Sequence, residues 1–373
     1  MAGIYIHIPF CKKACHYCDF HFSTTLNLVD DVVDSIALEA KRMKSYISEP
    51  IETIYFGGGT PSILNAKQLQ KITESIFQHY TIKDSIEFTL EANPDDLTEG
   101  KIVFLKNIGV NRLSIGTQSF NENILAFLNR SHTAEQTLES VDLCQQHGIS
   151  NLSLDLIYGI PEQSENQWKE DLKSMTQLNP THISCYALTI EEKTVFGNWR
   201  KKGKILEPKD ELVEEQYDFM VNYLQQKGYI HYEVSNFAKP TFISKHNSAY
   251  WHQNPYIGLG PGAHSFNGAT RQFNISNNSK YIKLIKANQP PFTTEKLDKN
   301  ELLTEYIFTK IRTYWGLDFN LMKQLFNYQL NNHQVEFINR IVSRKMATFV
   351  NNKLILNSKG FFISDSVVLE LIP

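Results

Sequence analysis

This chain of 373 residues has no long apolar run and carries little net charge. No uninterrupted apolar stretch approaches the roughly 18 residues of a bilayer-spanning helix, so no integral membrane segment is expected. The first ten residues lack the apolar core of a signal peptide. The formal net charge of −3 gives no global attraction to nucleic acid or to an anionic membrane. We therefore expect a cytoplasmic protein that binds no nucleic acid.

Cysteine is also scarce, and its distribution is uneven. Only five cysteines occur, and Cys11, Cys15 and Cys18 fall within eight residues. In a reducing compartment such a cluster indicates a metal site rather than a disulfide framework. Cys144 lies in a helical pattern and Cys185 in a strand-like one. For these two we expect small, buried apolar side chains.

The first two-thirds of the chain alternate strand and helix patterns. Apolar runs rich in Ile, Leu, Tyr and Phe predict strands at 4–8, 53–56, 86–90, 112–115, 152–157 and 183–188. Amphipathic helices are predicted at 28–47, 65–80, 98–108, 121–129, 133–147 and 164–178. Six such units predict right-handed βαβ repeats around a parallel sheet. They are too few for an eight-fold barrel, so the predicted fold is α/β, a partial (β/α)6 TIM-like barrel.

Three segments are expected along the chain. Residues 1–238 form the partial barrel, with a further helix at about 210–227 and a strand at 229–237. Residues 239–298, rich in Asn, Pro, Gly and Ser, are predicted to be a connector of long loops. Residues 299–373 are predicted to form a small α+β domain. Helices at 300–314, 319–327 and 333–345 precede a hairpin of 349–356 and 361–363, as in a winged helix. No dense Lys/Arg stripe marks these helices, so a structural or lid role is favoured over DNA binding.

The three clustered cysteines follow the first predicted strand with the spacing C-x3-C-x2-C. Three thiolates can hold a 4Fe–4S cluster and leave one iron open to a small chelating ligand. The alternative is a zinc site completed by His16 or His21. Zinc sites usually pair two closely spaced couples of ligands, and no second couple is present, which favours the cluster.

A run of glycines, Gly57-Gly58-Gly59-Thr60-Pro61, follows the second predicted strand. Glycines let the backbone approach a ligand closely. Parallel barrels place their sites at the carboxyl ends of the strands. Both motifs are expected there on adjacent strands, and the combination is more specific than either alone.

In these two motifs the sequence resembles the radical S-adenosylmethionine (SAM) proteins. The resemblance implies that the amino acid end of SAM chelates the open iron and that the glycine motif holds the methionyl amine. Glu91 is then expected to accept from the amine, Arg130 to pair with the carboxylate and Asp155 to accept from the ribose. The implied SAM residues are Tyr5, Tyr17, Gly57, Gly58, Thr60, Glu91, Gln118, Arg130 and Asp155. Each polar one also fits a simple hydrogen-bonding role at a barrel end.

More narrowly, nearly the whole chain resembles the coproporphyrinogen dehydrogenases (HemN) and their relatives, the heme chaperones (HemW). The segments 232–237 and 258–265 and the C-terminal domain carry this likeness. The dehydrogenases have a further cysteine where this chain has Phe20, and an N-terminal arm where only ten residues precede Cys11. Both departures favour the chaperones.

The stretch from His246 to Trp251 matches the H-N-x-x-Y-W pattern associated with heme handling in that group. His246 offers an imidazole for heme iron, and Tyr250 and Trp251 offer flat apolar surface for a macrocycle. With Asn247 these residues make up the implied heme site. A lone loop histidine is usually not a ligand, and the alternatives His252 and His264 are less favoured.

The sequence is compatible with three functions. The favoured one is a chaperone that passes heme to apo-hemoproteins of the respiratory chain, with cluster and SAM supporting structure, dimerisation or heme release rather than turnover. The second is the oxygen-independent oxidative decarboxylation of coproporphyrinogen III, in which a 5′-deoxyadenosyl radical abstracts hydrogen. The third, a zinc-bearing nucleic-acid module, conflicts with the charge balance. Membrane contact is expected only through a client protein, and a homodimer stays open.

Overall fold

A curved parallel sheet forms the centre of the computed structural model, which describes residues 2–161 and 163–373. Its six parallel strands pair in chain order, as the sequence predicts. They are β1 (Ala2–Ile8), β2 (Ile51–Gly58), β3 (Ile82–Ala92), β4 (Arg112–Gln118), β5 (Asn151–Tyr158) and β6 (His182–Ala187). Because these strands run in one direction, their carboxyl ends meet at one edge, where both motifs lie.

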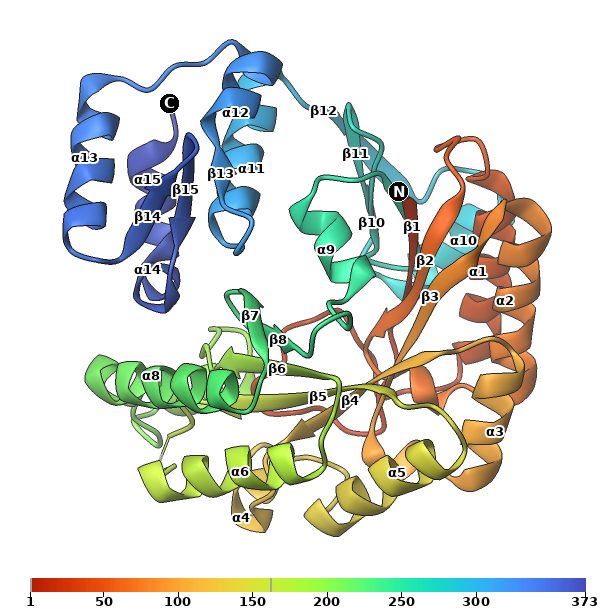
Figure 1. The fold of residues 1–373 in the computed structure, drawn as a ribbon. Helices are drawn as coiled ribbons and strands as arrows, with labels where there is room; N and C mark the ends of the chain where they lie inside the picture. Colours follow the sequence, from red (N-terminus) through yellow and green to blue (C-terminus); the bar gives the residue numbers. More distant parts are fainter. Residues whose placement is uncertain (1, 162) are drawn as a thin grey trace.

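Helices cover the convex, outer face of this sheet, and its concave face forms the inside of the partial barrel (Figure 1). They are α1 (Val29–Arg42), α2 (Ala66–His79), α3 (Glu99–Asn107), α4 (Glu122–Phe127), α5 (Ala134–Gln146) and α6 (Glu165–Gln177), with short 3-10 turns η1 (Pro61–Ile63) and η2 (Pro94–Asp96). Capping boxes start two of these helices: Thr133 pairs with Gln136 at α5, and Ser164 pairs with Gln167 at α6. The apolar residues of α1, α2, α3, α5 and α6 share one buried cluster with the sheet, which confirms the partial (β/α)6 barrel.

The second half of the barrel departs from the prediction. After α7 (Val195–Lys201) and α8 (Asp210–Gln226), the single strand expected at 229–237 is wrong. The chain forms an antiparallel hairpin, β7 (Ile230–Glu233) and β8 (Asn236–Ala238), and β8 pairs with β6. The apolar pattern of the sequence continues through the turn between β7 and β8, so it gave no sign that the strand is interrupted there.

The prediction of long loops over 239–298 is also wrong. This segment contains α9 (Lys245–Trp251), β9 (Tyr256–Leu259), β10 (His264–Phe266), β11 (Thr270–Asn274), α10 (Asn278–Lys286) and β12 (Phe292–Lys296). The strand β9 pairs parallel to β1, and β10–β12 extend the sheet to twelve strands. Glu39 of α1 joins this extension, since its buried carboxylate accepts from Gly260 N, Asn274 Nδ2 and Tyr281 OH at 2.6–2.8 Å.

The C-terminal segment has a buried apolar cluster of its own, drawn from residues 303–371. It comprises α11 (Lys299–Ile311), β13 (Leu317–Asp318), α12 (Phe319–Phe326), α13 (Asn332–Ser343), β14 (Ala347–Val350), β15 (Lys353–Leu356), α14 (Ser358–Phe362) and α15 (Ser364–Leu371). The three predicted helices are confirmed. The hairpin lies within 347–356, and the strand expected at 361–363 is wrong because that stretch belongs mainly to α14.

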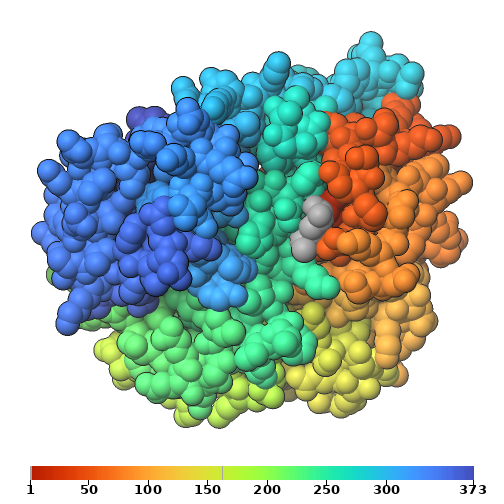
Figure 2. All heavy atoms as spheres, turned by 45° about the horizontal axis from the view of Figure 1, so that its top comes forward, coloured from red at the N-terminus to blue at the C-terminus, as the bar shows by residue number. Residues whose placement is uncertain are grey.

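The described part of the chain contains no helix with the length and hydropathy needed to cross a bilayer. Figure 2 shows the C-terminal segment (blue) and the N-terminal part of the chain (red) on opposite sides of a column formed by the middle of the chain. The α9 segment belongs to this column and also contacts α11 of the C-terminal segment.

Candidate SAM and iron–sulfur site

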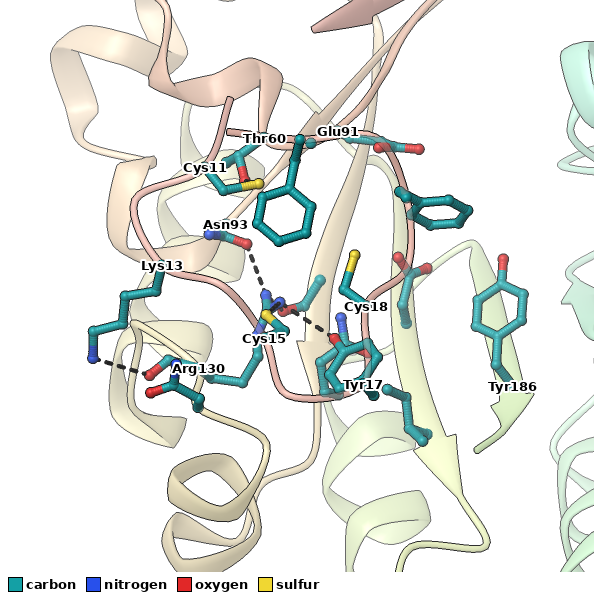
Figure 3. Close-up of a pocket in the computed structure, with 18 of the residues that line it drawn as sticks. Cys11, Lys13, Cys15, Tyr17, Cys18, Thr60, Glu91, Asn93, Arg130 and Tyr186 are labelled. Atoms are coloured by element: carbon teal, nitrogen blue, oxygen red, sulfur yellow. Dashed lines mark hydrogen bonds between the residues drawn. The ribbon is translucent and has the colours of Figure 1, made fainter. Parts of the chain in front are cut away.

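A cavity of about 490 Å³ opens at the carboxyl edge of the parallel strands. All three clustered cysteines line it, and Figure 3 shows their sulfur atoms facing a common space. The predicted residues that line it are Cys11, Cys15, Tyr17, Cys18, Gly58, Thr60, Glu91, Gln118, Arg130 and Asp155. The structure therefore brings together side chains from five strand ends that are far apart in the sequence.

The thiols sit on the loop that follows β1, and each is partly exposed to the cavity. Thr60 Oγ1 donates to Cys11 Sγ at 3.4 Å, and Arg130 Nη1 donates to Cys15 Sγ at 3.3 Å. Burial raises the pKa of the Cys18 thiol to about 11. Metal ligation replaces such a proton, and donors to sulfur stabilise the thiolate. The donor set thus fits a cluster held by three cysteines.

The zinc alternative requires a histidine as the fourth ligand. His16 Nδ1 lies 2.9 Å from the carbonyl of Phe127, and its ring packs against Trp199 with centroids 4.8 Å apart. His21 Nε2 lies 2.8 Å from Asn278 Oδ1. Neither histidine lines the cavity. The structure therefore disfavours a tetrahedral site of three cysteines and one histidine.

The glycine motif is shaped by its neighbours. A Cβ on Gly57 would lie 2.9–3.0 Å from Tyr55, Tyr5 and Glu91. Gly58 has φ +105°, and a Cβ on Gly59 would meet the carbonyl oxygens of Phe10 and Ile8 at 2.7–2.8 Å. Only glycine fits this conformation and spacing. The motif therefore lets β2 pack against the cysteine loop while Gly58 and Thr60 face the cavity.

Two half-buried carboxyl groups, Glu91 of β3 and Asp155 of β5, face the cavity. Burial raises the pKa of Glu91 to about 7, although hydrogen bonds from Tyr55 OH at 2.8 Å and Gly58 N at 3.2 Å oppose this shift. Burial likewise raises the pKa of Asp155 to about 6. Ionised carboxylates here would accept from the amine and hydroxyl groups of a ligand, and a cationic ligand would favour that ionised form.

Arg130 connects the cysteine loop to the strand ends. Its Nη2 donates to Asn93 Oδ1 at 2.7 Å and to the Gly116 carbonyl at 2.8 Å, and its Nη1 donates to Cys15 and, at 3.4 Å, to Tyr17 OH. Its Nε is buried and has no partner among the described residues. The guanidinium is therefore held beside the Cys15 thiol as a fixed positive charge.

Gln118 ends β4 with φ 66°, in the left-handed region that non-glycine residues rarely adopt. It is 8% exposed and lines the cavity. Such strain persists where the surrounding structure holds it, often at functional sites. The conformation supports a ligand-facing role for this side chain.

Several lining residues were not predicted, among them Lys13, Phe22, Asn93, Ser114 and Tyr186. Asn93 follows β3 directly, so its position at a strand end was an available signal. Conversely, Tyr5 does not line the cavity. The centroid of its ring lies 6.1 Å from the ring centroid of Tyr55 and 6.4 Å from that of His246.

The heme motif lies away from this cavity, on α9. The prediction that His246 lies in a loop is wrong, because His246 is on α9 and its side chain is 2% exposed. Its Nδ1 lies 2.7 Å from Thr53 Oγ1 and its Nε2 lies 3.0 Å from Tyr250 OH. Burial lowers its pKa to about 3, so the ring is neutral. Asn247, Tyr250 and Trp251 are partly exposed.

The family model of the radical SAM superfamily matches residues 5–175. The heme chaperone HemW of Lactococcus lactis is 33% identical over 364 residues, covering 97% of this chain and 95% of that protein. HemW of Bacillus subtilis is 36% identical and covers 85% of each chain. The structure of coproporphyrinogen III oxidase (HemN) from Escherichia coli matches with a TM-score of 0.87 at 19% identity, covering 100% of this chain and 90% of that one.

The fold and the cysteine-lined cavity define the class of radical SAM proteins, with the α/β fold seen in HemN. Within this superfamily the chain belongs to the HemW family, as its identity to HemW proteins along nearly its whole length shows.

Proposed function

We propose that this chain is a heme chaperone, which binds heme and delivers it to apo-hemoproteins such as respiratory enzymes. The observation that carries the proposal is the similarity along nearly the whole chain to proteins named heme chaperone HemW. Membership of the radical SAM superfamily implies a 4Fe–4S cluster and SAM. We propose that the cavity at the strand ends holds both.

In this proposal Cys11, Cys15 and Cys18 ligate the cluster, and all three line the cavity. Glu91, fixed by Tyr55 and Gly58, accepts from the methionyl amine. The guanidinium of Arg130 faces the carboxylate, and Asp155 accepts from the ribose hydroxyls. When bound, the reduced cluster can supply an electron to the sulfonium of SAM. The chain itself orients these groups in a partly enclosed site.

The heme site is proposed at α9. Trp251 is partly exposed, and its flat indole ring is suited to packing against a macrocycle. His246 can ligate iron only after it leaves its bonds to Thr53 and Tyr250. Heme binding is therefore proposed to include a local rearrangement of α9.

The rival function is oxidative decarboxylation of coproporphyrinogen III by the same cavity, since HemN shares the fold. One experiment compares the two directly. The anaerobically reconstituted protein is titrated with heme, then mixed with an apo-hemoprotein, and a parallel sample is given coproporphyrinogen III and SAM. The chaperone predicts a Soret shift, heme transfer and no divinyl product. Efficient conversion of coproporphyrinogen III without heme transfer would overturn it.

Clients, assembly and compartment belong to the same proposal. We propose that the protein works in the cytoplasm, where reduced thiols remain available to a cluster. Any contact with a membrane would then come through a membrane-bound client. A homodimer is the simplest assembly for a single-chain family member, and size-exclusion chromatography with and without the cluster tests it.

A further inference from the structure

A continuous set of contacts joins the heme motif to the SAM cavity. The ring of His246 stacks on the ring of Tyr55, with centroids 4.9 Å apart and planes at 21°. Tyr55 OH donates to Glu91 Oε1 at 2.8 Å, and Glu91 Oε2 accepts from Gly58 N at 3.2 Å. The histidine thus lies two contacts away from the carboxylate proposed to hold the amine of SAM.

His246 itself is held tightly in place. The buried carboxylate of Glu87 accepts from the backbone N–H groups of Lys245 and His246 at 3.0 and 2.9 Å, at the start of α9. A Cβ on Gly3 would lie 2.6 Å from Thr53 Oγ1 and 3.3 Å from the His246 ring. No room is left for the ring to shift while α9 stays packed.

Tyr55 has equally little freedom. It is 9% exposed, and Tyr5 stacks on it with ring centroids 6.1 Å apart. A Cβ at Gly57 would already contact Tyr55 at 2.9 Å. If His246 were removed, the face of Tyr55 that it covers would border a void, and the ring would no longer be confined to the orientation that reaches Glu91.

We infer that His246 is a positioning residue of the SAM site, acting through Tyr55 on Glu91, so that iron ligation by His246 opposes SAM binding. The inference rests on the proposed placement of SAM at Glu91. Tyr55 orients the carboxylate, and its hydrogen bond favours the ionised form. If His246 leaves to bind heme iron, this support is lost. By linkage, SAM must then weaken heme binding by the same factor.

The test measures SAM affinity in the heme-free, cluster-loaded protein by equilibrium dialysis. Tyr55→Phe should raise the Kd for SAM about tenfold, the size expected for one hydrogen bond to a charged group. His246→Ala should have a similar effect. His246→Phe keeps a ring over Tyr55 and should recover most of the affinity, although it cannot ligate iron. A role that depends on the hydrogen bonds of His246 to Thr53 and Tyr250 would not show this rescue, because Phe cannot make them.

The matched control is Tyr229→Phe, which removes a buried hydroxyl that donates to the Pro180 carbonyl at 2.7 Å, away from both sites. It should leave the Kd for SAM unchanged. If His246→Ala fails to fold, the Kd of Tyr55→Phe for SAM still tests the inference. An unchanged or lower Kd for SAM in Tyr55→Phe would overturn the inference.

A second measurement compares SAM affinity with and without bound heme in the wild-type protein. Heme should raise the Kd for SAM about fivefold or more, the lower end of typical coupling between sites, and Tyr55→Phe should reduce this factor. Equal affinities would contradict the antagonism. A wild-type protein that binds no SAM would instead refute the proposed function, so the two failures are distinguishable.

Discussion

The carboxyl group of Glu91 offers a direct test of the SAM site because its pKa is raised to about 7. The fraction ionised should fall from about 90% at pH 8 to about 10% at pH 6. If the ionised form accepts from the amine of SAM, its contribution to affinity should fall about tenfold over that range. Raising the pH through 7 therefore strengthens SAM binding.

The perturbation is Glu91→Gln, and the assay is the Kd for SAM from pH 6 to 8 in anaerobically reconstituted protein. At pH 8 the variant should bind at least about 30-fold more weakly, since removing a buried charged partner costs about 2 kcal/mol or more. SAM's own amine titrates identically in both experiments. The ratio of the two Kd values therefore isolates Glu91, and it should shrink about tenfold by pH 6. A ratio that is constant with pH, or equal affinities at pH 8, would refute this role.

Three further outcomes are expected. Cys15→Ala should abolish the visible absorbance of the cluster, whereas Cys144→Ala, at a buried helix position, should keep it. Glu39→Ala should lower the free energy of unfolding by roughly 3–5 kcal/mol, because it leaves three buried donors unpaired. In urea titrations Glu39→Gln should lose less, and equal losses would count against this reasoning. Trp168→Ala, at a fully buried side chain, should cost about 3–5 kcal/mol; a loss below 1 kcal/mol would contradict its place in the core.

Local patterns predicted the barrel because each of its units is specified by residues near one another. Thr133 and Gln136 form their capping box within one turn, and Gly109 and Gly148 end helices with φ 97° and 78°. The cysteine loop was likewise predictable, since the spacing of Cys11, Cys15 and Cys18 lies within one segment. Their common edge followed from the parallel order of the strands.

The errors occurred where distant contacts decide the structure. The strand β9 forms by pairing with β1, more than 240 residues away, and short polar strands such as β11 show little apolar alternation. The sequence suggested that His246 is free to bind a ligand because its partners, Thr53 on β2 and Glu87 on β3, lie far from it along the chain. No pattern around residue 246 could show that α9 packs into the barrel interior.

In the proposed site, three thiols hold a cluster with one iron open to SAM. Electron paramagnetic resonance of the reduced, anaerobically reconstituted protein measures this arrangement. We expect a 4Fe–4S signal whose g-values change when SAM is added, and loss of that signal in Cys15→Ala. A protein that carries only zinc, or a cluster whose spectrum SAM leaves unchanged, would contradict it.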